Sequence, residues 1–270
     1  MKRSSFATKF KGYIIENRPL LDPVNCGEDL IYNAGRAILL APMGCINCGG
    51  YHSRFTARRV SEELLQRPPT SIALDRPHLI ALLKAHFETA ILNSNTRSFN
   101  IVIPGAADTG ILATCAHAAA LLGNEVLGRC NITVIDRCAT PLELCKEFAE
   151  RHNFSIKTLQ HDFLINPPML SADLVVAHSL LRFFEPNEQI DVLNLFGSWL
   201  NKDGKLILSH GFREKITLEN PGEIASLDHA RHLFAQSNLQ ELSSEVLQFK
   251  IKSAEGGFVT KERMIAILGI

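Results

Sequence analysis

From residue 99 to residue 210, short apolar runs alternate with longer segments whose apolar residues recur at helical spacing. The short runs, rich in Val, Ile and Leu, predict buried strands at 99–104, 131–136, 155–160, 172–178 and 204–210. The segments between them predict helices at 109–122, 141–152 and 186–200. Strands that alternate with helices favour a parallel sheet covered by helices on both faces.

The C-terminal part of the chain has a different pattern. A helix is expected at 222–236, followed by strand-like runs at 244–252 and 259–268. Gly256 and Gly257 lie between the two runs, which predicts a terminal antiparallel hairpin.

The N-terminal region lacks the alternating strand pattern. Helices are expected at 28–40, 56–66 and 75–92, with a glycine-rich loop at 42–51. In the third helix we expect Asp75 as the N-cap and Pro77 in the first turn, where a missing N–H has no cost. We therefore predict a helical subdomain at 1–95 and an α/β domain at 96–270.

Composition narrows the class of protein. The chain is 46% hydrophobic and 21% charged, enough for a sizeable core, and 28 basic residues balance 28 acidic ones. A neutral balance argues against a dedicated nucleic-acid surface. No secretory signal and no apolar stretch of about 18 residues is present, so no membrane span is expected. Seven scattered cysteines favour reduced thiols and a cytoplasmic location.

The ends of the predicted strands carry the candidate chemistry, because ligands of open α/β sheets bind beyond the carboxyl ends of the strands. In IVIPGAADTG, Gly105 and Gly110 let the backbone turn sharply and approach a ligand, although a tight turn without a ligand has the same pattern. Asp136 ends the second strand and can accept hydrogen bonds from ribose hydroxyls. Its alternative is a helix cap, but Thr140 and Glu143 form a capping box that would serve instead.

A third group follows the next strand, in the run QHDF. Asp162 can accept a hydrogen bond from an adenine amino group while Phe163 packs on the ring. A loop aspartate beside a core phenylalanine is an equally good interpretation.

The order of these features resembles the class I S-adenosylmethionine-dependent methyltransferases over about residues 97–270. The resemblance rests on the turn IVIPGAADTG, the acidic end of ITVID, QHDF, the strand DLVVAH, and GKLILSH after the turn at Lys202-Asp203-Gly204. It implies a Rossmann-like, seven-stranded, mostly parallel sheet with a terminal antiparallel hairpin, plus an N-terminal helical lid. It also implies S-adenosylmethionine as cofactor, bound by Gly105, Ala107, Asp108, Gly110, Asp136, Arg137, Asp162, Phe163 and His178.

The glycine-containing turn departs from the family pattern. Ile103 stands where the family has an acidic residue, and Ala107 replaces the central glycine. Asp108 is an additional residue in the turn, and we expect it to take over the hydrogen bond to the amino group of the cofactor's methionine moiety.

The cofactor determines the chemistry that the resemblance implies. A sulfonium methyl is already electrophilic, so the protein has to align the acceptor and exclude water, with a base only where the acceptor loses a proton. His178 and His210, at the ends of two strands, are candidate bases, and Arg182 is a candidate for binding an acidic substrate group. The alternative for each is a local structural role.

The N-terminal loop contains a C-x-x-C pair, Cys45 and Cys48, followed by His52. Such a trio can bind zinc, with Cys26 as a fourth ligand, but two buried thiols without metal is the interpretation that we favour. A redox role lacks the surrounding strand–turn–helix. As part of a lid, Tyr51, His52 and Arg54 would line the substrate pocket.

Other functions fit parts of the same pattern. A nicotinamide-dependent oxidoreductase also uses a glycine turn and an acidic strand end, but the short-chain type needs a late tyrosine, whereas the chain has only Tyr13, Tyr32 and Tyr51. A P-loop motif is absent from the sequence. A non-catalytic cofactor-binding scaffold stays open. We expect a small-molecule substrate and no nucleic-acid or membrane partner. The sequence is also compatible with a homodimer.

Overall fold

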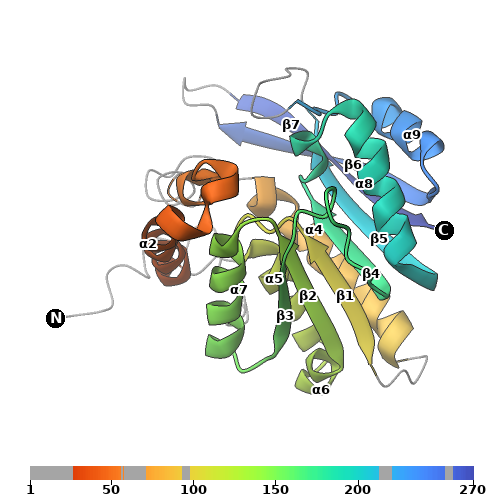
Figure 1. Cartoon of the computed structure of the whole chain (residues 1–270). Helices are drawn as coiled ribbons and strands as arrows, with labels where there is room; N and C mark the ends of the chain where they lie inside the picture. Colours follow the sequence, from red (N-terminus) through yellow and green to blue (C-terminus); the bar gives the residue numbers. More distant parts are fainter. Residues whose placement is uncertain (1–26, 56, 58–70, 93–97, 213–220, 253–257) are drawn as a thin grey trace.

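A computed structural model describes residues 27–55, 57, 71–92, 98–212, 221–252 and 258–270 (Figure 1). Its centre is a seven-stranded sheet of order β3-β2-β1-β4-β5-β7-β6. The strands are β1 Phe99–Pro104, β2 Cys130–Asp136, β3 Ile156–Gln160, β4 Ala172–His178, β5 Leu200–Gly211, β6 Gln240–Lys252 and β7 Phe258–Gly269. Strands β1 to β5 pair in parallel, and β7 pairs antiparallel with both β5 and β6. The predicted Rossmann-like fold and its terminal hairpin are confirmed.

Helices cover both faces of this sheet. The α-helices are α2 Gly27–Gly44, α4 Ser71–Phe87, α5 Gly110–Ala120, α6 Asn124–Gly128, α7 Ala139–Arg151, α8 Pro186–Trp199 and α9 Leu227–Gln236. Short helical turns are η3 Ile46–Cys48, η4 Glu88–Leu92 and η5 Leu181–Phe183. The helix expected at 56–66 lies outside the described residues. Among the described helices, none is long and apolar enough to cross a membrane.

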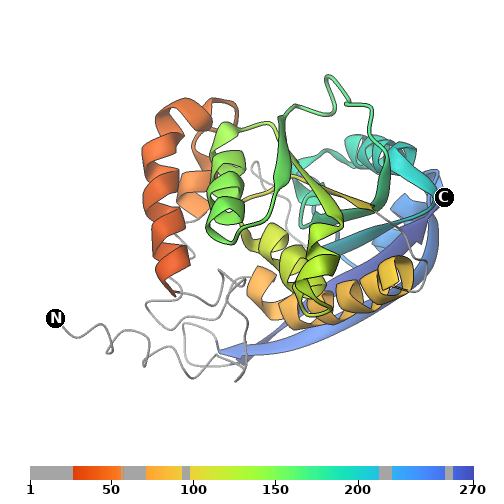
Figure 2. The same cartoon turned by 90° about the horizontal axis from the view of Figure 1, so that it is seen from below.

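The sheet separates two hydrophobic cores because side chains alternate along each strand. Ile101 and Ile103 of β1 point into the core formed with α4, α5 and α7, whereas Val102 points into the core formed with α8 and α9. Figure 2 shows α4 lying beside α5 and α6 on the lower face of the sheet. Helix α4 is therefore part of the core, although it belongs to the region assigned to the N-terminal subdomain.

Helix α4 begins at Ser71, four residues before the position that the sequence predicts. The prediction that Asp75 is its N-cap and that Pro77 lies in its first turn is therefore wrong. Asp75 is fully buried inside the helix, where it pairs with Arg263 of β7. A buried charged partner, rather than a free helix end, explains an aspartate at this position.

Helix α7 also begins earlier than predicted, with Cys138 as its N-cap. Thr140 is buried in the first turn and accepts a hydrogen bond from the Cys45 thiol at 2.9 Å, so it forms no capping box. The Oδ1 atom of Asp136 instead accepts a hydrogen bond from the backbone N–H of Cys138 at 2.7 Å. Asp136 lies two residues before this N-cap, so it does not cap α7, and its bond to Cys138 is a local turn contact.

Two contacts hold α2 against the α/β part of the molecule (Figure 1). Arg36 pairs with Glu147 of α7, and the Nε–Oε1 distance is 3.0 Å. Asn33 donates a hydrogen bond from Nδ2 to the hydroxyl of Thr109, the N-cap of α5, at 3.0 Å. These contacts place the loop that follows α2 near the carboxyl ends of the strands.

Candidate cofactor and substrate site

The register of the sheet brings the predicted motifs together. Pro104 of β1 lies opposite Ile135 of β2, so Gly105 comes to lie beside Asp136. Asp136 in turn lies opposite Gln160 of β3, which places Asp162 next to the same edge. Since β1 has β2 on one side and β4 on the other, this is the position where the strand order reverses.

A cavity of about 350 Å³ opens at this edge. Its volume lies at the lower end of the range for small-molecule sites. Except for Pro221, which precedes α9, the lining residues come from the ends of β1 to β4 and from the N-terminal loop: Cys48, Tyr51, His52, Arg54, Gly105, Ala107, Asp136, Arg137, His161, Asp162, Phe163, Leu180, Phe183, Phe184 and Pro221.

Gly105 is required by the turn itself. Its φ angle is +69°, a conformation that favours glycine, and a Cβ there would lie 2.3 Å from Cδ1 of Leu180. Its backbone N–H donates to the carbonyl of Ile135 at 2.7 Å. The residue therefore shapes the cavity wall, and its amide is already engaged within the protein.

Asp136 lines the cavity and is only 6% exposed. Its Oδ2 atom is 3.8 Å from Nε2 of His52. Burial raises the pKa of this carboxyl to about 6, although His52 and the hydrogen bond from Cys138 act in the opposite direction. Hydrogen bonds from the hydroxyl groups of a ligand would offset the desolvation cost of burying this carboxylate.

Asp162 and Phe163 form the adjacent wall. The Phe163 ring is buried against Phe184, Phe196 and Trp199, with centroid distances of 6.0, 5.9 and 6.1 Å. It also contributes to the cavity surface, so the core interpretation is confirmed, and packing on an adenine ring stays a prediction. Arg137 also lines the cavity.

The N-terminal loop contributes Tyr51, His52 and Arg54 to the cavity wall. The Tyr51 ring packs edge-on against Phe183 at 5.3 Å and stacks on Phe55 at 5.8 Å. Sequence reasoning expected these three residues at the substrate pocket, and the structure places them at the cavity. A contact with substrate stays a prediction.

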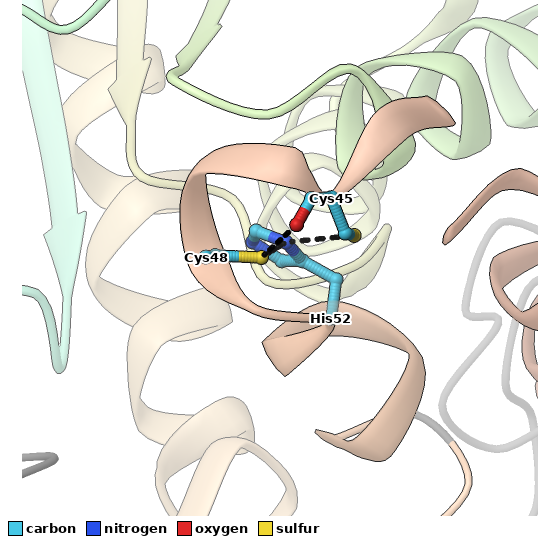
Figure 3. A group of neighbouring side chains, drawn as sticks. All are labelled: Cys45, Cys48 and His52. Atoms are coloured by element: carbon cyan, nitrogen blue, oxygen red, sulfur yellow. Dashed lines mark hydrogen bonds between the residues drawn. The ribbon is translucent and has the colours of Figure 1, made fainter. Parts of the chain in front are cut away.

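Two thiols of the same loop lie around the His52 ring. Nδ1 of His52 is 3.6 Å from Sγ of Cys45 and 3.3 Å from Sγ of Cys48 (Figure 3). Burial raises the pKa of Cys45. Burial also acts to raise the pKa of Cys48, but hydrogen bonds with His52 and Cys138 outweigh it and lower that pKa to about 5.

Asp108 and Gly110 do not line the cavity, contrary to the sequence-based expectation. Oδ1 of Asp108 accepts a hydrogen bond from the backbone N–H of Gly110 at 2.7 Å, and Asp108 is 3% exposed. The carboxylate thus satisfies a backbone donor at the start of α5 instead of projecting toward a ligand.

His178 is held in a buried network with Asp75, Ser209 and Arg263. Its Nε2 atom is 3.1 Å from Oδ2 of Asp75 and 3.0 Å from Nη2 of Arg263. Burial lowers the pKa of His178. Because these partners occupy Nε2 and the residue does not line the cavity, the structure does not place this histidine as a base or a cofactor ligand.

His210 and Arg182 also lie off the cavity wall. His210 is 1% exposed within β5, opposite Met264 of β7. Arg182 forms an ion pair with Glu223, whose side chain is 2% exposed. The predicted roles of these two residues toward substrate therefore lack support from the geometry.

Sequence reasoning missed several residues of the cavity. His161 directly precedes Asp162 in QHDF, so the prediction of Asp162 as a site residue could have been extended to His161. Leu180, Phe183 and Phe184 follow β4, in a segment whose apolar character looked like ordinary core. Pro221 carried no signal of its own.

Comparison with known proteins identifies the fold. No family model and no curated protein sequence matches the chain. The mitomycin 7-O-methyltransferase MmcR is 13% identical and matches with a TM-score of 0.50 over 92% of this chain and 74% of its own. TehB from Haemophilus influenzae is 11% identical, with a TM-score of 0.50 over 69% of this chain and 66% of its own.

A third similar structure comes from work on the conversion of a disulfide bond into a thioacetal group during echinomycin biosynthesis. It is 16% identical, with a TM-score of 0.51 over 75% of this chain and 85% of its own. Identities at this level establish the fold alone. The chain has the Rossmann-like fold of the class I S-adenosylmethionine-dependent methyltransferases.

Proposed function

We propose that the chain is a methyltransferase that binds S-adenosylmethionine in the cavity at the strand ends and transfers its methyl group to a small molecule. The observation that carries the proposal is the convergence of Gly105, Asp136 and Phe163 on one cavity. In this proposal Asp136 accepts hydrogen bonds from the ribose, and Asp162 with Phe163 holds the adenine. Arg137, beside Asp136, would border the nucleoside.

The start of α5 supports this cofactor over a nicotinamide dinucleotide. In dinucleotide-binding folds the N-terminus of the helix after β1 faces the pyrophosphate, whose negative charge the free backbone N–H groups stabilise. Here the Asp108 carboxylate already accepts the Gly110 N–H. A negative charge at that position would repel a pyrophosphate, whereas it is compatible with a cationic sulfonium ligand.

The N-terminal wall of the cavity is the side that we assign to the acceptor. Tyr51 and Phe183 offer an aromatic surface, and Arg54 adds a cationic group at the rim. A cavity of about 350 Å³ fits a small acceptor better than a macromolecule. The cofactor supplies an electrophilic methyl group, and the chain's own residues would align the acceptor and exclude water.

Calorimetry on the purified chain tests the proposal. S-adenosylmethionine and S-adenosylhomocysteine should bind at one site, and NAD should not. Asp136→Asn, which removes an acceptor charge with little change in volume, should weaken binding at least tenfold. Asp191→Asn on the exposed face of α8 is the matched control and should bind as the wild type does.

Two results would overturn the proposal. Saturable NAD binding without affinity for the methyl donor would establish an oxidoreductase-type site. Binding of neither ligand would favour a scaffold that keeps only the fold.

A further inference from the structure

The loop that connects α2 to the cavity folds into a compact turn around its two cysteines. The backbone N–H groups of Cys48 and Gly50 both donate to the carbonyl of Cys45, each at 3.3 Å. Gly49 and Gly50 have φ angles of +57° and +78°, which let the chain reverse directly after Cys48. As a result His52 returns to face both thiols (Figure 3).

The spacing of these side chains matches a tetrahedral metal site. With Zn–S bonds of about 2.3 Å and Zn–N bonds of about 2.0 Å, a tetrahedral zinc ion holds sulfur and nitrogen ligands about 3.5 Å apart. The distances from Nδ1 of His52 to the sulfurs of Cys45 and Cys48 are 3.6 and 3.3 Å. The three ligand atoms lie within 4.8 Å of one another.

The other ring nitrogen of His52 also has the environment of a metal-bound histidine. Such a histidine usually presents its second N–H to a carboxylate, which fixes the ring and increases its basicity. Nε2 of His52 faces Oδ2 of Asp136 at 3.8 Å. The pair is almost fully buried, with side-chain exposures of 7% for His52 and 8% for Asp136.

A third thiol stands next to the trio. Cys138, the N-cap of α7, shares a hydrogen bond with Cys48, and its sulfur belongs to a second group of close ligand atoms with His52 and Asp136. Three sulfurs and one imidazole nitrogen form a donor set that selects zinc over magnesium or calcium.

We propose that Cys45, Cys48, His52 and Cys138 bind one zinc ion, which fastens the N-terminal loop to the carboxyl end of β2. The loop and α7 are distant in sequence, so the ion would join the wall assigned to the acceptor to the wall assigned to the nucleoside. Four protein ligands make the site structural, because no coordination position is left for substrate. The inference is independent of methyl transfer, since the binding of zinc is measured without either cofactor or acceptor.

The test uses the full chain, reduced and freed of metal, and titrated with Zn²⁺ and with Co²⁺. We expect one tightly bound zinc per chain, and a cobalt complex with the absorption of a tetrahedral thiolate site. Cys48→Ser should weaken zinc binding at least a hundredfold. Cys138→Ser should weaken it at least tenfold and reduce the thiolate-to-cobalt absorption by about a third, because one of three sulfurs is lost.

Cys130→Ser is the matched control, because Cys130 begins β2 whereas Asp136 ends it, so the control thiol lies at the opposite end of the same strand. It should bind zinc as the wild type does. If the wild type binds no zinc, or if Cys130→Ser loses zinc as Cys48→Ser does, the site is refuted. Unchanged cobalt absorption in Cys138→Ser would refute the four-ligand set. Cys48 is only partly buried, so its variant should stay folded, which circular dichroism checks.

Discussion

Replacing Asp75 by asparagine tests the buried network that joins α4 to strands β4, β5 and β7. Asp75 is fully buried, and its Oδ2 atom accepts a hydrogen bond from Nε of Arg263 at 2.7 Å. Ser209 and His178 contact the same carboxylate. The asparagine would keep the shape of the side chain but leave the Arg263 guanidinium buried without a counter-charge.

The ion pair and the pKa of Asp75 each give a magnitude for the expected loss in the free energy of unfolding. Removing one partner of a buried ion pair typically costs about 3–5 kcal/mol. Burial alone would raise the pKa of Asp75, but Arg263 and His178 outweigh it and lower the pKa to about 2 from the usual 3.8. At about 1.36 kcal/mol per pH unit this interval corresponds to about 2 kcal/mol. We therefore expect Asp75→Asn to lose roughly 3 kcal/mol at pH 7, near the lower end because the amide still hydrogen-bonds.

The pH dependence has a definite sign. A carboxyl whose pKa is depressed by folding stabilises the protein above its unfolded pKa, and this contribution disappears as the pH falls from about 3.8 toward 2. His178 acts in the same direction at higher pH, because burial lowers its pKa and the unfolded chain takes up a proton below about 6.5. Wild-type stability should therefore fall in acid, and its advantage over Asp75→Asn should shrink below about pH 4.

Urea unfolding at several pH values measures these differences. Arg263→Met and the double variant complete a double-mutant cycle, and the double variant should cost less than the sum of the single changes. Asp191→Asn, an exposed carboxylate on α8, should change the free energy of unfolding by less than about 0.5 kcal/mol. A loss below about 1 kcal/mol in Asp75→Asn, or additive single changes, would refute the network.

Three further predictions concern the turn, the aromatic wall and an ion pair. Gly105→Ala should destabilise the chain by about 1–3 kcal/mol in urea unfolding, because φ is positive and the new methyl meets Leu180; an unchanged midpoint would contradict this. Phe163→Leu should cost less than about 1.5 kcal/mol of stability yet weaken S-adenosylmethionine binding severalfold in calorimetry, whereas wild-type affinity would remove the ring from the nucleoside site. Arg182→Met should lose roughly 3 kcal/mol of stability with unchanged cofactor affinity, since Arg182 pairs with Glu223 outside the cavity; the reverse outcome would return it to the site.

Periodicity predicted the central strands well because β1 and β4 are buried on both faces. The apolar run 99–104 coincides with β1, and the run 172–178 coincides with β4. Helix starts were predicted less well because they depend on tertiary contacts. Asp75 and Thr140 have the residue types of caps, yet a buried ion pair and a thiol hydrogen bond fix them inside their helices.

For the candidate site, position relative to the strands was more informative than residue type. Asp136 ends a strand, Phe163 follows one, and both reach the cavity. His178 ends a strand and Arg182 follows it, but each binds a residue distant in sequence, Arg263 or Glu223, and neither lines the cavity. The approach of Cys138 to the C-x-x-C turn depends on the packing of α2 against α7, which no local pattern contains.

A crystal structure of the chain with S-adenosylhomocysteine tests the proposed cofactor site most directly. The ribose hydroxyls should bind the Asp136 carboxylate, the adenine should lie between Asp162 and Phe163, and the sulfur should point toward Tyr51. A nucleoside bound elsewhere on the chain, or an Asp136 carboxylate without a ligand contact in an occupied cavity, would contradict it.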